Sequence, residues 1–233
     1  MKKDMKVKVC GLRDAQNILQ VAALSVDWIG FDFLPGSPRY MSMIPTHAGI
    51  IPDRSSLSHP TLDAEHPTPL RVGVFADEMA QNIITRVVNF QLDFIQLNGH
   101  EMPTFIRNLR RTLDPDIRPG IKFMKAITVI KRDDIATYKN YADSVDYFLF
   151  DVQQKSTEGK TNWSVLDAYD GEQPFLISGN IGPNDALTIR QSLAINSFPI
   201  EKCLGINLDT RFESSPGIKN IELLTHFLEE LRH

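Results

Sequence analysis

The stretch VKVCGLRDAQNILQVAAL, residues 7–24, contains the repeating unit from which the fold can be predicted. VKVC (7–10) is a short apolar run, typical of a buried strand. Gly11 follows it, and DAQNILQVAAL (14–24) then begins at an N-cap candidate, Asp14, and carries apolar residues at helical spacing. A strand, a turn and a helix in this order form the unit from which parallel sheets are built.

The same order of segments recurs along the chain. Strand-like runs lie at 7–10, 27–33, 70–76, 93–97, 121–127, 146–151, 174–178 and 202–208. Helical patterns lie at 14–24, 44–51 (the weakest), 78–90, 101–113, 133–142, 163–169, 182–193 and 219–232. The strands are rich in Val, Ile, Leu and Phe, as strands buried on both faces are. Eight such pairs predict an α/β fold of the (β/α)8 TIM barrel type. An open doubly wound sheet is the alternative, but no GxGxxG follows the first strand.

Composition and charge narrow the classes of protein to which the chain can belong. No linker divides the 233 residues, which predicts a single barrel domain over 1–233, with an extended surface loop at 52–69, where four prolines occur. The net charge of −4 and the lack of a long basic run argue against nucleic acid as a partner. The chain contains no run of 18 apolar residues, which argues against a membrane span. Two cysteines without metal-ligand spacing are typical of a reduced, cytoplasmic enzyme.

Two strand ends carry side chains suited to acid–base chemistry. Cys10 ends the first predicted strand, and Asp151 ends the sixth. The carboxyl ends of barrel strands surround one mouth. The thiol and the carboxylate can therefore approach a small substrate from two directions, as a base and an acid must. Structural interpretations stay open: a lone cysteine is often core, as we expect for Cys203, and an aspartate after a strand often caps a helix.

Small polar residues in the last two strand–helix loops indicate an anion site. SGNIGPND (178–185) follows the seventh predicted strand, and DTRFESSPGIKN (209–220) follows the eighth. Backbone N–H groups at helix N-termini bind anions, and barrels frequently hold a substrate phosphate between these two loops. Two ordinary turns are the alternative, but their joint occurrence in the expected places favours phosphate binding.

Several motifs together resemble those of the phosphoribosylanthranilate isomerases of tryptophan biosynthesis. They are KVCGL (8–12), SPRY (37–40), FLFDVQQKSTEGKTNWSVL (148–166) and ESSPGIK (213–219). The matching stretches follow in order and cover nearly the whole chain. The resemblance implies a barrel that performs an Amadori rearrangement of N-(5-phosphoribosyl)anthranilate, with Asp151 as the general acid and Cys10 as the general base.

The resemblance also implies the rest of the site. Arg39 would face the anthranilate carboxylate, whose geometry a guanidinium matches. Gly179, Asn180 and the backbone around Asp209 and Thr210 would hold the phosphate. It implies no metal or organic cofactor and a small-molecule phosphosugar as the partner. The sequence leaves both a monomer and a homodimer open.

Two positions depart from the usual pattern of that family. Asn98 stands in QLNG (96–99) where members commonly have histidine, and Asn207 stands in GINLD (205–209) where they commonly have aspartate. Both remain candidate substrate-binding residues. The retained acid and base favour the isomerase. The alternatives are a drifted paralogue that acts on another aminated phosphosugar, and a non-catalytic barrel that only binds a phosphosugar or a partner protein.

Overall fold

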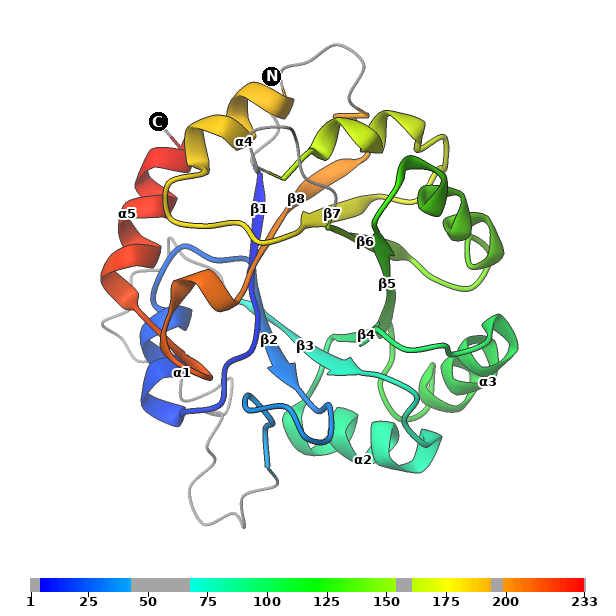
Figure 1. Cartoon of the computed structure of the whole chain (residues 1–233). Coiled ribbons are helices and arrows are strands. Elements are labelled where there is room, and N and C mark those ends of the chain that lie inside the picture. The colour runs from blue at the N-terminus through cyan, green and yellow to red at the C-terminus, as the bar shows by residue number, and fades with distance from the viewer. Residues whose placement is uncertain (1–4, 43–67, 154–160, 194–198, 233) are drawn as a thin grey trace.

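Eight parallel strands close into a barrel in the order of the chain (Figure 1). The computed structural model describes residues 5–42, 68–153, 161–193 and 199–232. The strands are β1 (Lys6–Val9), β2 (Trp28–Asp32), β3 (Leu70–Phe75), β4 (Phe94–Leu97), β5 (Lys122–Val129), β6 (Tyr147–Val152), β7 (Phe175–Ser178) and β8 (Cys203–Leu208). The ring closes where β1 pairs with β8, with Lys8 beside Asn207 in the register. The predicted (β/α)8 barrel is confirmed.

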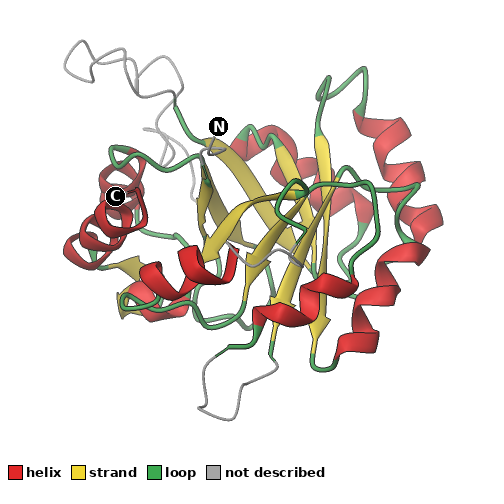
Figure 2. Cartoon of the chain, turned by 90° about the horizontal axis from the view of Figure 1, so that it is seen from above, coloured by secondary structure: helices red, strands yellow, loops and turns green. Residues whose placement is uncertain are grey.

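Helices cover the outside of the barrel, as Figure 2 shows. The α-helices are α1 (Ala15–Ala22), α2 (Ala80–Phe90), α3 (Pro103–Leu113), α4 (Ala186–Leu193) and α5 (Ile221–Arg232). The predicted N-cap of α1 is confirmed, because the Asp14 carboxylate accepts a hydrogen bond of 2.8 Å from the Asn17 N–H. Within the described ranges, no helix has both the length and the apolar character needed to cross a membrane.

Two predicted helices are 3-10 helices instead. They are η1 (Arg132–Asn140) and η2 (Trp163–Ala168). At the start of η1 the Asp134 carboxylate accepts hydrogen bonds from the N–H groups of Ile130 and Lys131, which holds a tight first turn. The predicted helix at 44–51 and residues 52–67 of the predicted surface loop lie outside the described residues.

The core has two parts, which decide where a ligand can enter. The larger part lies between the strands and the helices and includes Cys203, which is 6% exposed, so its predicted place in the core is confirmed. The smaller part fills the barrel interior with large apolar side chains: Trp28, Val72, Phe94, Met124, Leu149 and Leu176. Several of these side chains stand early in their strands, so the open space lies at the carboxyl ends.

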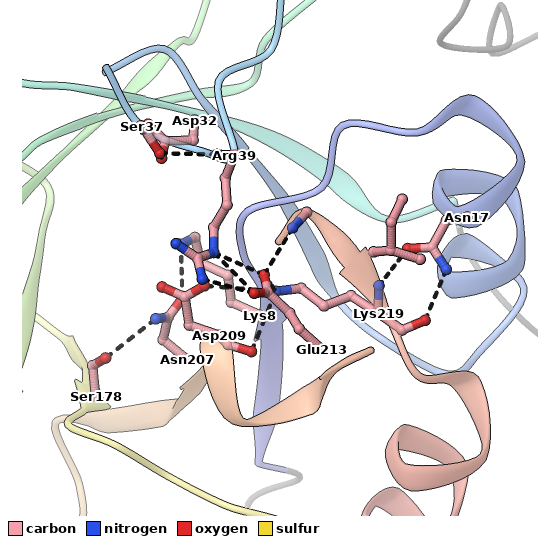
Figure 3. Close-up of polar contacts among 12 residues, drawn as sticks. Lys8, Asn17, Asp32, Ser37, Arg39, Ser178, Asn207, Asp209, Glu213 and Lys219 are labelled. Carbon is pink, nitrogen blue, oxygen red and sulfur yellow. Dashed lines mark hydrogen bonds and ion pairs between the residues drawn. The ribbon is translucent and has the colours of Figure 1, made fainter. Parts of the chain in front are cut away.

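A short hairpin follows β8, a feature that the sequence pattern does not predict. It consists of β9 (Glu213–Ser215) and β10 (Ile218–Lys219), joined in an antiparallel pair. The buried Asn17 side chain of α1 holds the hairpin, because its amide exchanges hydrogen bonds of 2.7 and 2.9 Å with the backbone of Lys219. The hairpin places two ionisable side chains, Glu213 and Lys219, behind the barrel mouth (Figure 3).

Candidate active site

A cavity of about 190 Å³ opens at the carboxyl ends of the strands. All eight strands or the residues that directly follow them contribute to its wall. The lining residues are Cys10, Gly11, Asp32, Leu34, Arg39, Val74, Gln96, Asn98, Ala126, Thr128, Leu149, Asp151, Ser178, Asn207 and Asp209. The structure therefore brings together six of the predicted site residues: Cys10, Arg39, Asn98, Asp151, Asn207 and Asp209.

Cys10 lies directly after β1, and two glycines give it room. Its N–H donates to the Leu208 carbonyl at 2.9 Å, which continues the pairing with β8. A Cβ atom at Gly30 of the neighbouring strand would lie 2.7 Å from the Cys10 sulfur. Gly11 turns the chain with φ +77°, a conformation that side chains rarely adopt. The backbone thus delivers the thiol to the cavity wall.

Electrostatic surroundings act on the Cys10 thiol in both directions. Cys10 is 7% exposed, and burial raises the pKa of the thiol because it disfavours the charged form. The positive charge of Lys8 opposes this effect, whereas the carboxylate of Asp209 adds to it. The net result is a raised pKa, so the thiol form dominates near neutral pH in the free protein.

Asp151 stands at the carboxyl end of β6, across the cavity from β1. It pairs in register with Thr128 of β5 and Ser178 of β7, both of which also line the cavity. Its side chain is half-buried and accepts a hydrogen bond of 2.7 Å from the Gln153 amide. A thiol and a carboxyl group thus face one cavity from separate strands, as the sequence predicts.

Asn207 belongs to a chain of buried polar contacts below the cavity. Its Oδ1 accepts a hydrogen bond of 2.7 Å from the Lys8 ammonium, and its Nδ2 donates to the Ser178 hydroxyl at 3.2 Å (Figure 3). Asn98, the other neutral departure, accepts a hydrogen bond of 2.9 Å from the Gln96 amide. The Asn207 amide is therefore buried in the cavity wall, whereas Asn98 lines the cavity as an exposed residue.

Arg39 reaches the cavity while bound to a carboxylate of the hairpin. Its Nε and Nη2 donate to the two oxygens of Glu213 at 2.8 and 2.7 Å. Glu213 also accepts from the Lys219 ammonium at 2.8 Å. Burial raises the pKa of Glu213, but the hydrogen bonds from Arg39 and Lys219 outweigh it and leave the pKa below its usual value. Glu213 is therefore a fixed anion behind the arginine.

The Asp209 carboxylate is divided between solvent and the protein interior. Its side chain is 44% exposed, yet its Oδ1 atom is buried and has no hydrogen-bond partner among the described residues. The Lys219 ammonium lies 3.6 Å from that oxygen. Burial raises the pKa of Asp209, and the charges of Lys219 and Lys8 only partly offset this effect.

The remaining predicted phosphate residues lie at the rim. Gly179 and Asn180 both have positive φ, +122° and +54°, directly after β7. A Cβ at Gly179 would lie 2.2 Å from the Val152 carbonyl, so only glycine fits there. Thr210 is exposed and begins η3 (Thr210–Phe212), the 3-10 helix after β8. Among the described residues these three stand outside the set that lines the cavity.

Sequence reasoning assigned no role to several groups of this site. They are Lys8, Asp32, Gln96, Ser178, Glu213 and Lys219. A signal existed for Lys8, because residues two apart in a strand share a face, and Lys8 precedes Cys10 by two. Glu213 and Lys219 lie in the quoted motif ESSPGIK, but only the hairpin shows that Glu213 bonds to both Arg39 and Lys219.

Residues 7–230 match the family model of N-(5'-phosphoribosyl)anthranilate (PRA) isomerase. The chain belongs to this family. A curated N-(5'-phosphoribosyl)anthranilate isomerase from Parabacteroides distasonis is 34% identical over 232 residues, which cover 98% of this chain and 94% of the relative. The PRA isomerase resemblance drawn from the sequence is confirmed.

Solved structures of PRA isomerases share the fold. One, in complex with reduced 1-(o-carboxyphenylamino)-1-deoxyribulose 5-phosphate, matches with a TM-score of 0.68 and 21% identity over 98% of both chains. Another, of monomers generated from the dimeric enzyme of Thermotoga maritima, matches with a TM-score of 0.68 and 22% identity over 98% of both chains. At these sequence identities the structural similarity shows a shared barrel fold.

Proposed function

We propose that Cys10 and Asp151 perform, in this cavity, the Amadori rearrangement of N-(5-phosphoribosyl)anthranilate to 1-(2-carboxyphenylamino)-1-deoxyribulose 5-phosphate. Membership of the PRA isomerase family makes the chain an isomerase of tryptophan biosynthesis. The observation that supports the two residue roles is the shared cavity, with a thiol after β1 and a carboxyl group at the end of β6.

The reaction needs one acid and one base in succession. Asp151 donates a proton to the furanose ring oxygen, the bond between that oxygen and C1′ breaks, and the nitrogen lone pair forms an iminium ion. The Cys10 thiolate then removes the proton from C2′, and the released electron pair forms the C1′–C2′ double bond of an enolamine. Protonation at C1′ and loss of the hydroxyl proton at C2′ give the ketone.

The iminium ion explains why a buried thiol is an adequate base. The positive charge beside C2′ acidifies the C2′ proton, so the base need not be strong. The thiolate must still form in a buried position, where its formation is disfavoured. Nearby positive charge is therefore part of what this site must supply.

Substrate binding is proposed for the residues around this pair. The Glu213 carboxylate occupies the Nε–Nη2 edge of Arg39, and the opposite edge is offered to the anthranilate carboxylate. Asn98 and Asn207 supply amide groups at the wall. The loops with Gly179 and Asn180, and with Asp209 and Thr210, supply backbone N–H groups for the phosphate.

The wider setting follows from the same proposal. The partner is a small-molecule phosphosugar, bound without a metal or an organic cofactor. The structural relative from Thermotoga maritima is described as dimeric, and both a monomer and a homodimer fit this chain. We place the enzyme in the cytoplasm, where its two cysteines stay reduced.

The test is turnover of freshly prepared phosphoribosylanthranilate, followed by the loss of its fluorescence. The wild type should convert it, and Cys10→Ala and Asp151→Asn should each lose about a hundredfold or more in kcat. Cys203→Ala is the matched control, since its thiol is in the core, and it should keep the wild-type rate. If folded wild-type protein shows no turnover, the neutral Asn98 and Asn207 mark another aminated phosphosugar as the substrate. Wild-type rates in both variants would overturn the assigned roles.

A further inference from the structure

Lys8 is a fully buried cation whose hydrogen-bond partner is neutral. It is 0% exposed and stands in β1 inside the barrel. Its ammonium donates to the amide oxygen of Asn207 at 2.7 Å (Figure 3). In the part of the chain that the structure describes, no carboxylate lies within ion-pair distance of the Lys8 ammonium.

The other buried lysines show how unusual this arrangement is. Among the described residues, Lys125 and Lys219 are also buried. Lys125 pairs with Glu101 at 3.0 Å, and Lys219 pairs with Glu213 at 2.8 Å. A buried ammonium is costly unless a counter-charge compensates it. Lys8 therefore lacks the compensation that the protein gives to both other buried lysines.

Cys10 occupies the position from which that compensation can come. It follows Lys8 by two residues in an extended strand, so both side chains stand on the same face, toward the barrel interior. A thiolate at Cys10 would place a negative charge beside the Lys8 ammonium. The electrostatic influence of Lys8 on the thiol is larger than that of any other charged side chain.

Other ionisable side chains around Cys10 do not substitute for Lys8. Asp209, after β8, disfavours the thiolate, and Lys219 of the hairpin favours it less than Lys8 does. Lys219 is already bound to Glu213 at 2.8 Å. The cavity wall adds Asp32, Arg39 and Asp151, and Arg39 is paired with Glu213 at 2.7 Å.

We propose that Lys8 is a positioning residue that stabilises the Cys10 thiolate, and that Asn207 is the group that holds Lys8 without neutralising it. The neutral amide fixes the ammonium in place and leaves its charge available to the thiol. An aspartate at 207 would form the ion pair that Lys125 and Lys219 have, and would remove that help. This inference rests on the proposed role of Cys10 as the base.

The test measures the ionisation of the Cys10 thiol without substrate. In a Cys203→Ala background Cys10 is the single thiol, and its rate of alkylation by iodoacetamide is recorded against pH. Asn207→Asp and Lys8→Met should each raise the pH midpoint by about one unit or more, the usual effect of a neighbouring charge. Ser178→Ala is the matched control, since it removes the other partner of Asn207 without changing any charge, and its midpoint should stay in place.

Circular dichroism and thermal unfolding establish that each variant is folded before its thiol is titrated. Unchanged midpoints in folded Asn207→Asp and Lys8→Met overturn the inference, whatever the turnover. Raised midpoints support it. If the midpoints rise but Cys10→Ala keeps its activity, the electrostatic pair stands and the proposed role of Cys10 as the base fails. The pH profile of kcat/KM should move to higher pH in Asn207→Asp if both are correct.

Discussion

The Arg39 guanidinium and the Glu213 carboxylate tie the loop after β2 to the hairpin after β8 through hydrogen bonds of 2.8 and 2.7 Å. The two residues are 174 positions apart in the sequence. Glu213 also accepts a hydrogen bond from the buried Lys219 ammonium. One carboxylate thus holds a cavity-lining cation in place and compensates a second cation behind it.

Replacing that carboxylate should damage both binding and stability. Glu213→Gln frees Arg39 to move and should raise KM for phosphoribosylanthranilate about tenfold, with a smaller change in kcat. It also leaves Lys219 buried without its closest counter-charge, which should lower the free energy of unfolding by about 3 kcal/mol. Steady-state kinetics and urea unfolding measure the two effects.

The control for Glu213→Gln is an exposed ion pair. Glu172, 87% exposed, bonds to Lys202 at 2.5 Å, and Glu172→Gln should change stability by less than about 1 kcal/mol. Equal stability loss in the two variants would mean that burial of the Glu213 pair has no special effect.

Gly30 should be intolerant of even one added methyl group. Gly30→Ala would place a Cβ 2.7 Å from the Cys10 sulfur, so the thiol must shift. A displacement of this kind should lower kcat by about a hundredfold, with little change in KM. Gly120→Asn is the control, because that position is open and asparagine tolerates its φ of +76°. Wild-type kcat in Gly30→Ala would show that the position of the thiol is not critical.

The pH dependence of kcat/KM should follow the ionisation of the Cys10 thiol. In the proposed mechanism the active form is the thiolate, and burial raises the pKa of the Cys10 thiol. In the free enzyme kcat/KM should therefore rise with pH through the neutral range, toward a limit at or above the usual thiol pKa of about 8.5. A profile that is flat between neutral and alkaline pH would contradict a thiol base.

Asp209 should reduce stability at neutral pH. Its pKa is raised in the folded protein, so the charged form is less favourable there than in the unfolded chain. The resulting stability is present below the unfolded pKa, about 3.9, and is lost as pH rises through the folded pKa. Asp209→Asn should therefore raise Tm at neutral pH, and the difference from wild type should shrink at acid pH. A lower Tm for Asp209→Asn at neutral pH would reverse the assigned sign.

Local pattern suffices to predict the barrel and to place the two candidate acid–base residues at one cavity. Strand-length apolar runs and the residues at their ends identify Cys10 and Asp151, because every strand of such a barrel ends at the same mouth. The types of η1 and η2 are not predicted, since short segments of helical character do not distinguish 3-10 from α geometry.

The polar contacts around the cavity cannot be predicted from the sequence, because they form only when the barrel closes. A lysine inside an apolar strand, such as Lys8, carries no sign of its partner, and Asn207 lies 199 positions away. Glu213 joins Lys219 and Arg39 only because the hairpin forms after β8. Contacts of this sequence separation depend on the register between distant strands, which local periodicity cannot provide.

The reactivity of the Cys10 thiol depends on the pairing of β1 with β8, the seam that closes the barrel. Lys8 and Cys10 lie on one side of this seam, and Asn207, Leu208 and Asp209 lie on the other. Contacts that span so much of the chain are slow to form, because a long loop must first be closed. Before the seam closes, the contacts of β1 with Asn207 and Leu208 are missing, so the reactivity of the thiol should be that of an ordinary cysteine. The rate at which Cys10 is alkylated during refolding should therefore report when the β1–β8 seam closes.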